Sequence, residues 1–434
     1  MPYDIITGRD EADKKRFEKK GLIFLGKGYV TMGRYTSLSN PIYMDVARSH
    51  VVLVSGKRGS GKSYTLGVMA EELATLQGEE KKNIASLIFD TMGIFWTMKY
   101  DNEKEGELLA EWKLKPKKTP VKIFIPFGYY DEYQKRGLPV DNQFSINPGE
   151  LEAEDWIMTF NLDIIEPAAI LIERIITKLK EQKDRFSIKD IIQEMQADTS
   201  VSQETKNAGI GLFEAAQSWK IFSEKEISIT DLISPAKTTI LDLSMYSSVG
   251  AFNVRALVIG LVTRKLFKQR MLARKTEEVQ AVEHGIDYLA FKQKREMPLV
   301  WLFIDEMHEF LPEEGKTAAS DALIQLLREG RQPGLSLAMA TQQPGRLARD
   351  AITQADIIIS HRVTAAPDIQ ALNEIMQSYL LESIKDYMDQ LPSLKGSAII
   401  LDDNSERIYP MRVRPRFTWH GGEAPTAIKV EKRL

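Results

Sequence analysis

The sequence predicts an α/β fold in which a mostly parallel sheet is covered by helices on both faces. Short runs rich in Val, Ile and Leu recur along the chain, and stretches with helical spacing of apolar residues separate them. Parallel strands are buried on both faces, so they are apolar throughout instead of alternating. The runs lie at 51–54, 86–89, 121–125, 238–243, 299–304, 335–340, 357–360 and 398–401.

A glycine-rich loop follows the first of these runs. The letters GKRGSGKS (56–63) match the pattern GxxxxGK[ST], with an apolar run before them and a helical stretch after them. Backbone N–H groups of such a loop surround phosphate oxygens, and the next helix adds the positive potential of its N-terminus. A chance match is the alternative, and the flanking strand and helix argue against it. We therefore predict a nucleotide site.

Individual residues of this loop have distinct expected roles. A helix is expected to begin near Lys62, whose amine would reach the terminal phosphates of the nucleotide. The Ser63 hydroxyl would complete the coordination of a Mg²⁺ ion carried in with the nucleotide. The predicted nucleotide-binding residues are Gly56, Lys57, Arg58, Gly59, Ser60, Gly61, Lys62, Ser63 and Tyr64.

Two carboxylates end the apolar run at 299–304. In LVWLFIDE they are Asp305 and Glu306, the pattern expected at the end of a strand in a nucleotide hydrolase. Asp305 would bind Mg²⁺ through water, and Glu306 would polarise the attacking water as the catalytic base. The alternative is that they only cap the helix that follows, as acidic residues near helix starts do. A phosphate loop in the same chain favours the catalytic interpretation.

Further candidate site residues flank the run at 335–340. After it, Gln342 is placed to contact the γ-phosphate or the attacking water, the alternative being an amide that caps a turn. Before it, LLREGRQPG contains two arginines, one of which would stabilise transition-state charge in a neighbouring subunit. Arg331 is favoured over Arg328, because the glycine and proline around it indicate an exposed loop. The alternative for either is a solvated surface arginine.

Two features allow two interpretations each from the sequence. Asp90 ends the run at 86–89 and either faces the nucleotide or its magnesium, or caps a turn. The stretch from Arg264 to Lys275 is strongly basic and either contacts DNA phosphates or forms a solvated helix face.

Composition excludes several classes of protein. The chain of 434 residues has 58 basic and 61 acidic residues, so a nucleic-acid partner would have to meet local basic patches instead of a global positive field. There are no cysteines, which excludes disulfides, thiolate zinc sites and cysteine nucleophiles. No apolar run approaches the roughly 18 to 20 residues that span a bilayer, and the N-terminus is too charged for a secretory signal. We expect a soluble, cytoplasmic protein.

The pattern of apolar runs predicts an α/β core with an N-terminal segment, a helical insertion and a C-terminal extension. A short β-rich N-terminal segment (1–48) contains strand-like pieces at 22–25 and 29–32 that would form a hairpin. The core would occupy 49–140 and 234–415, interrupted by a helical insertion at 141–233. Residues 416–434 would form an extension that either lies on the surface or reaches a neighbouring subunit. The insertion has an apolar helical stripe after Pro167, made of Ala169, Ile172, Ile175, Ile176 and Leu179.

These motifs, in this order, resemble the HerA family of hexameric ATPases, within the HerA and FtsK group of DNA-pumping motors. The resemblance includes SLSNPIYMDVARSHVVLVSGKRGSGKS, LISPAKTTILDLS, WLFIDEMHEFLP, LLREGRQPGLSLAMATQQPGRL and HGGEAP. It implies a RecA-like P-loop core, a homo-hexameric ring with ATP and Mg²⁺ between subunits, and double-stranded DNA in the central pore. Carried over by position, it implies phosphate binding by Lys62 and Ser63, magnesium binding by Asp305, a catalytic base at Glu306, sensing by Gln342 and a trans-acting arginine finger at Arg331.

The sequence departs from the family in two places. Family members usually carry an N-terminal β-barrel, whereas about 50 residues precede the phosphate loop here. The glutamate that usually follows the aspartate of the second strand in a GE-like pair is absent, because Gly93 is followed by Ile94. These departures leave any docking through the barrel, and a strict match to archaeal repair members, unsupported.

The resemblance predicts a DNA translocase or helicase-type motor that serves a separate effector, such as a nuclease, in DNA end processing or antiviral defence. No nuclease constellation is visible in the sequence, so cutting would need a partner. The alternative is an ATP-gated scaffold that assembles or activates an effector without processive DNA movement. A conjugation or secretion coupling ATPase shares the core, but that class predicts a membrane anchor.

Overall fold

The computed structural model describes residues 3–32, 35–223, 229–247, 252–283, 297–376 and 384–422. Thirteen strands in this part of the chain form one sheet, in the order β1-β3-β2-β13-β12-β11-β4-β10-β9-β5-β8-β6-β7. The strands are β1 (Ile5–Thr7), β2 (Leu22–Met32), β3 (Tyr35–Asp45), β4 (Val51–Ser55), β5 (Ile84–Asp90), β6 (Val121–Pro126), β7 (Asn142–Phe144), β8 (Thr238–Asp242), β9 (Leu299–Ile304), β10 (Leu335–Thr341), β11 (Ile357–His361), β12 (Ser397–Asp402) and β13 (Arg407–Val413).

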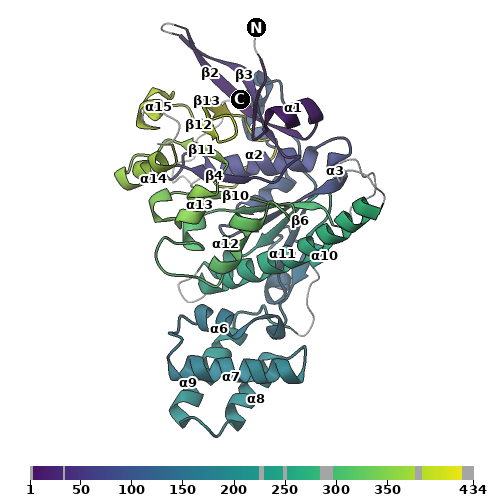
Figure 1. Cartoon of the computed structure of the whole chain (residues 1–434), viewed down its shortest axis with the longest axis vertical. Coiled ribbons are helices and arrows are strands. Elements are labelled where there is room, and N and C mark those ends of the chain that lie inside the picture. The colour runs from purple at the N-terminus through teal and green to yellow at the C-terminus, as the bar shows by residue number, and fades with distance from the viewer. Residues whose placement is uncertain are drawn as a thin grey trace.

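The helices fall into a set that covers this sheet and a set that lies apart from it (Figure 1). The α-helices are α1 (Glu11–Phe17), α2 (Lys62–Thr75), α3 (Glu80–Asn83), α4 (Gly106–Glu111), α5 (Tyr130–Lys135), α6 (Ala153–Thr159), α7 (Pro167–Gln182), α8 (Ile188–Ala197), α9 (Gln203–Gln217), α10 (Ile229–Leu232), α11 (Phe252–Glu283), α12 (Ser320–Glu329), α13 (Arg349–Thr353), α14 (Ala366–Met376) and α15 (Ile384–Gln390).

The centre of the sheet is parallel, as predicted. Strands β11, β4, β10, β9, β5, β8 and β6 are neighbours in that order, and each adjacent pair runs in the same direction. Every apolar run identified in the sequence lies in a strand of this sheet, except that the run at 238–243 extends one residue beyond β8. Strands β11, β12, β13, β2 and β3 pair antiparallel along the other half. The α/β fold with a mostly parallel sheet is therefore confirmed.

Both faces of the sheet are covered, which explains why its strands are apolar throughout. Alternate residues of β4 belong to two separate apolar clusters, with Leu53 in one and Val52 and Val54 in the other. Helix α2 contributes Leu66 to the cluster of Val52, whereas α11 and α12 contribute to the cluster of Leu53. A strand buried on two faces has no solvent-facing positions, so no alternation of polar residues appears.

The predicted N-terminal hairpin is wrong in its details. Residues 22–25 and 29–32 belong to a single strand, β2, which pairs with β3. The glycines between the two pieces do not form a turn: they lie at bulges of the β2–β3 ladder. A Cβ on Gly26 would lie 2.1 Å from the carbonyl oxygen of Arg412 in β13. Glycine is required there because the β13 backbone approaches closely.

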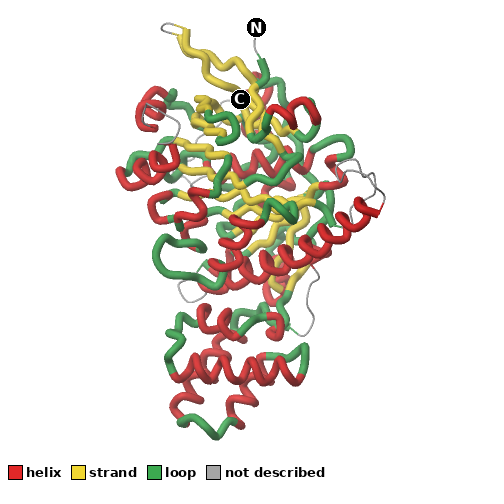
Figure 2. The backbone as a smooth tube through the Cα atoms, in the orientation of Figure 1, coloured by secondary structure: helices red, strands yellow, loops and turns green. Residues whose placement is uncertain are grey.

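Helices α6 to α9 form a cluster below the sheet in the view of Figure 1, and Figure 2 shows no strand among them. The stripe predicted on α7 is buried against this cluster. Trp156 of α6 lies at its centre, with the ring centroid of Phe213 of α9 at 4.9 Å. The predicted insertion at 141–233 also contains the short strand β7, which pairs with β6 at the edge of the sheet and which the sequence did not indicate.

The basic stretch of α11, from Arg264 to Lys275, is partly engaged inside the chain, although Lys268 and Lys275 are exposed. Arg264 makes a bidentate ion pair with Asp155 of α6, and Lys265 pairs with Glu150. Arg270 is fully buried and donates to the carbonyl oxygens of Pro333 and Met297. These cations connect α11 to the helical cluster and to the loop before β10.

Candidate functional site

The loop after β4 has the backbone geometry that phosphate binding requires. Strand β4 ends at Ser55 and α2 begins at Lys62, as predicted. Gly56, Gly59 and Gly61 have φ values of 152°, 75° and 116°, a region that residues with a Cβ rarely adopt. A Cβ on Gly56 would also lie 2.5 Å from Oγ of Ser60. The loop therefore depends on glycine for both its conformation and its packing.

Ser63, at the start of α2, meets the first carboxylate of the strand-ending pair. Its Oγ donates a hydrogen bond of 2.5 Å to Oδ2 of Asp305. Burial raises the pKa of Asp305, and the neighbouring charge of Glu306 raises it further. Lys62 is also buried, and burial lowers the pKa of its amine. Two hard oxygen groups beside a lysine, at the N-terminus of a helix, form a site suited to a phosphate–Mg²⁺ group.

Glu306 is held in a strained position beside Gln342. Its backbone is left-handed, with φ 51° and ψ 48°, which is uncommon for a residue with a side chain and is often found at functional sites. Gln342, which follows β10, donates a hydrogen bond from Nε2 to Oε1 of Glu306. The other oxygen, Oε2, is buried and accepts no hydrogen bond from the described residues. His308 lies 3.6 Å from it, and burial lowers the pKa of His308.

A second buried polar atom lies in the phosphate loop. Oγ of Ser60 has no hydrogen-bond partner among the described residues. Buried polar atoms are normally paired, so unpaired ones at Ser60 and Glu306 indicate groups that a ligand or water would satisfy. The described residues contain no cluster of three metal-ligating side chains. Ser63 and Asp305 fit a Mg²⁺ ion whose other ligands are phosphate oxygens and water, since Mg²⁺ usually keeps such ligands.

Arg331 lies far from the phosphate loop of its own chain. Strands β4 and β10 are parallel, with Thr341 paired to Ser55 beside the loop. Arg331 precedes β10 and therefore lies at the opposite edge of the sheet, roughly 20 Å away at about 3.3 Å per residue. It is exposed and makes no hydrogen bond or ion pair with the described residues. Arg328, in contrast, makes a bidentate ion pair with Asp350.

Asp90 caps a turn. Its carboxylate accepts hydrogen bonds from the backbone N–H groups of Gly93, Ile94 and Phe95. Burial, and then the adjacent carboxylate of Asp242, raise the pKa of Asp90 to about 7. It does not line the cavity beside the phosphate loop. Of the two interpretations that the sequence allowed, the structure supports the cap.

The cavity beside the phosphate loop has a volume of about 670 Å³ and contains most of the predicted site. It is lined by Arg58 to Tyr64, Asp305, Glu306 and Gln342, and not by Arg331. Sequence reasoning missed its other walls, which come from 92–94, from 102–112 and from 395–422. The missed lining residues with polar or aromatic side chains are Thr65, Asn102, Lys104, Glu105, Trp112, Lys395, Arg412, Arg414, Trp419 and His420.

Comparison with known families identifies the chain. A family model described as "Helicase HerA, central domain" matches residues 30–265, more than half of its length. The chain belongs to the HerA family. The match covers the phosphate loop, the helical cluster α6–α9 and part of α11. The earlier resemblance to this family is therefore confirmed.

One curated relative of this HerA-family chain is the DNA double-strand break repair helicase HerA of Pyrococcus furiosus. The two are 26% identical over 184 residues, which are 39% of this chain and 31% of that protein. The aligned part thus spans about a third of the relative's length.

Solved structures show the same fold at low identity. The structure of VirB4 of Thermoanaerobacter pseudethanolicus matches with a TM-score of 0.55 and 12% identity, covering 91% of this HerA-family chain and 96% of that one. The bacterial conjugative coupling protein TrwBdeltaN70, in its unbound monoclinic form, matches with a TM-score of 0.51 and 12% identity, covering 96% and 94%. Among the described residues, no helix is long and apolar enough to cross a membrane.

Proposed function

We propose that this HerA-family protein is an ATP-driven, ring-shaped DNA motor of the translocase or helicase type. The main support is one arrangement: Ser63 bonded to Asp305, and Glu306 bonded to Gln342, in a single cavity that begins at the phosphate loop. These are the parts that phosphoryl transfer to water requires, namely a phosphate cradle, a magnesium site and a residue that positions the nucleophile.

Each residue has a specific task in this proposal. The loop N–H groups and Lys62 bind the phosphates of ATP, while Ser63 and Asp305 hold Mg²⁺, which neutralises charge on the phosphate oxygens when bound. Glu306 accepts a proton from the attacking water through Oε2, its unpaired oxygen. The nearby His308 does not neutralise this carboxylate, because burial lowers the pKa of His308. Gln342 fixes the other oxygen and so reports the state of the site to the loop after β10.

The proposed assembly is a homo-hexameric ring, and the position of Arg331 supports an active site that is shared between neighbouring subunits. This arginine is exposed, unpaired within the described chain, and at the sheet edge opposite to its own phosphate loop. It therefore has the accessibility to enter the site of a neighbouring subunit, where a guanidinium stabilises charge on the transferred phosphoryl group. ATP would be hydrolysed at subunit interfaces.

We assign duplex DNA in the central pore as the cargo and a separate effector, such as a nuclease, as the partner. The Pyrococcus furiosus relative is a DNA double-strand break repair helicase, which supports the DNA assignment. DNA end processing and antiviral defence are both settings that suit a motor serving an effector.

A second candidate is an ATP-gated scaffold that activates an effector without moving DNA. One observation favours it: the basic stretch of α11 is partly engaged inside the chain, through Arg264 with Asp155 and Lys265 with Glu150. These cations are not available to DNA phosphates unless the pairs open.

The deciding experiment measures ATP turnover by the purified protein with and without duplex DNA. A motor is expected to hydrolyse ATP several-fold faster with DNA. Glu306→Gln is expected to lose at least a hundredfold in kcat while it still binds ATP, because it keeps the shape of the side chain and removes the base. Glu314→Gln, an exposed glutamate outside the cavity, is the matched control.

The outcomes separate the candidates. Turnover that is present but unaffected by DNA would contradict the motor and favour the scaffold. Full activity of Glu306→Gln would remove the assignment of the base, and a lack of nucleotide binding by the wild-type protein would overturn both candidates.

A further inference from the structure

The cavity extends beyond the phosphate loop to a wall built by the C-terminal part of the described chain. Tyr64, Asn102 and Glu105 line this end of the cavity, together with Trp419 and His420. Phosphates bound at 56–63 would occupy the other end, next to Asp305 and Glu306. The far end therefore lies where the remaining part of a nucleoside triphosphate has to go.

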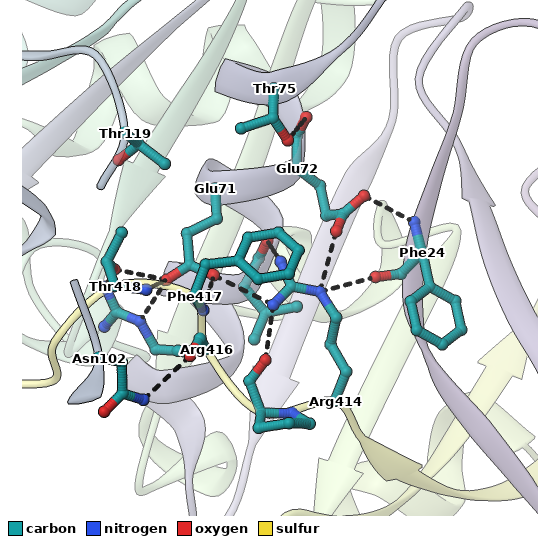
Figure 3. A network of polar contacts seen from close by, with 12 residues as sticks. Phe24, Glu71, Glu72, Thr75, Asn102, Thr119, Arg414, Arg416, Phe417 and Thr418 are labelled. Atoms are coloured by element: carbon teal, nitrogen blue, oxygen red, sulfur yellow. Dashed lines mark hydrogen bonds and ion pairs between the residues drawn. The ribbon is translucent and has the colours of Figure 1, made fainter. Parts of the chain in front are cut away.

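Helix α2 fixes this wall through a fully buried carboxylate (Figure 3). Glu71 is bonded by the guanidinium groups of Arg414 and Arg416, by the backbone N–H groups of Phe417 and Thr418, and by the Thr418 hydroxyl. Burial opposes ionisation, but the charges of Arg416 and Arg414 outweigh it and the pKa of Glu71 is lowered. The segment 414–418 is thus tied to the helix that begins at Lys62.

Tyr64 is held between Glu105 and the C-terminal segment 414–418. Its hydroxyl donates a hydrogen bond of 2.7 Å to Oε2 of Glu105 and accepts one of 2.6 Å from the backbone N–H of Arg416. The His420 ring meets the Tyr64 ring at 75°, with a centroid separation of 5.2 Å. Two aromatic rings that are fixed before a ligand binds lose little entropy when they contact a flat base.

A carboxylate lies beside these rings. Oε2 of Glu105 also accepts a hydrogen bond of 2.8 Å from Nδ2 of Asn102, which donates a second one to the carbonyl oxygen of Arg416. Both recorded donors use the same oxygen of Glu105. A carboxylate has about four acceptor sites on two oxygens, so Glu105 retains capacity for an N–H or O–H donor of a ligand.

We propose that this wall is a nucleoside subsite that takes the purine base of the triphosphate, with His420 and Tyr64 against the base and Glu105 accepting from a ligand donor. This assignment rests on the proposed function, because it concerns the same nucleotide. It makes the segment 412–422 part of the active site, although the sequence places that segment about 350 residues after the phosphate loop.

The test compares binding of ATP, CTP and inorganic tripolyphosphate, each with Mg²⁺, by titration calorimetry. Tripolyphosphate has the phosphates of ATP but no nucleoside. His420→Ala is expected to weaken ATP binding about tenfold and to change tripolyphosphate binding less than twofold. Lys62→Ala is expected to weaken both. Tyr100→Ala is the matched control, because Tyr100 is an exposed ring whose carbonyl oxygen accepts from the N–H of Trp419 and which does not line the cavity.

The results test the nucleoside subsite, the contact with a purine and the proposed function separately. Equal losses of ATP and tripolyphosphate binding in His420→Ala, or no loss of either, would overturn the subsite. Wild-type binding of CTP as tight as that of ATP would overturn contact with a purine. If the wild-type protein binds ATP and Lys62→Ala does not, the proposed function stands whatever happens at His420. If the wild-type protein binds neither ligand, the proposed function fails and the subsite fails with it.

Discussion

Gln342, which follows β10, donates a hydrogen bond to the carboxylate of Glu306, which follows β9. The two strands are parallel neighbours, so their carboxyl ends bring these side chains to the same edge of the sheet as the phosphate loop. This bond leaves one oxygen of Glu306 engaged and the other unpaired within the described chain. Changes at the loop after β10 would therefore alter the group that we assign as the base.

Gln342→Ala is expected to lower kcat by at least tenfold and to leave the affinity for ATP nearly unchanged, because Gln342 orients Glu306 and does not hold the phosphates. Single-turnover hydrolysis and equilibrium binding of ATP measure the two effects separately. Gln325→Ala, an exposed glutamine on α12, serves as the control. A loss of binding as large as that of Lys62→Ala would assign Gln342 to ATP binding instead.

Arg331→Ala is expected to abolish most hydrolysis, and activity is expected to return when this variant is mixed with Lys62→Ala. The first variant keeps an intact phosphate loop, and the second keeps an intact Arg331, so mixed rings contain interfaces with both. Restored ATP turnover in the mixture is the measurement. Arg328→Ala, which removes a paired arginine nearby, is expected to remain active. Normal turnover by Arg331→Ala alone would place the finger elsewhere.

The central sheet and the phosphate-binding half of the site could be predicted because both depend on local sequence. Unbroken apolar runs indicate strands that are buried on both faces of a sheet. The sequence GKRGSGKS needs its glycines for the backbone geometry of the loop, whatever residues surround it. Asp305, Glu306 and Gln342 follow such runs, so the parallel arrangement of the strands brought them together.

The other features of the fold and the site could not be predicted, because they depend on contacts between residues that are distant in sequence. Gly26 looks like a turn residue, but its role is set by the β13 backbone, almost 400 residues later. Arg414 and Arg416 look like surface residues, but both are fully buried. Their guanidinium groups donate hydrogen bonds to Glu71. One signal was available: Glu71 lies within the apolar sequence LGVMAEELA of α2, where a carboxylate needs a buried partner. The domain boundaries remain a prediction.

Stability is expected to fall as the pH rises from about 6.5 to about 9, because of His50. Burial disfavours its charged form, but hydrogen bonds to Asp356 and Asp45 outweigh burial and raise the pKa of His50 to about 9. The protonated ring stabilises the folded state fully below the unfolded pKa of about 6.5, and this contribution is lost through pH 9. The shift corresponds to about 3 kcal/mol.

Urea unfolding at several pH values between 6 and 9.5 measures this slope. His50→Gln keeps one hydrogen-bond donor and is expected to be less stable at pH 6 and nearly independent of pH across the window. His420→Gln replaces a partly exposed histidine and is expected to keep the wild-type slope. A wild-type profile that stays flat between pH 6.5 and 9 would show that His50 is not charged in the folded protein.

Glu71→Ala is expected to be the most destabilising of these substitutions. It leaves Arg414 and Arg416 buried without their shared carboxylate, and removal of one partner from a buried ion pair costs about 3–5 kcal/mol. Glu72→Ala provides the comparison, since Glu72 also pairs with Arg414 but has a side chain that is 16% exposed. Chemical denaturation should rank Glu71→Ala below Glu72→Ala in free energy of unfolding. The reverse order would mean that Glu72, and not Glu71, holds the C-terminal segment against α2.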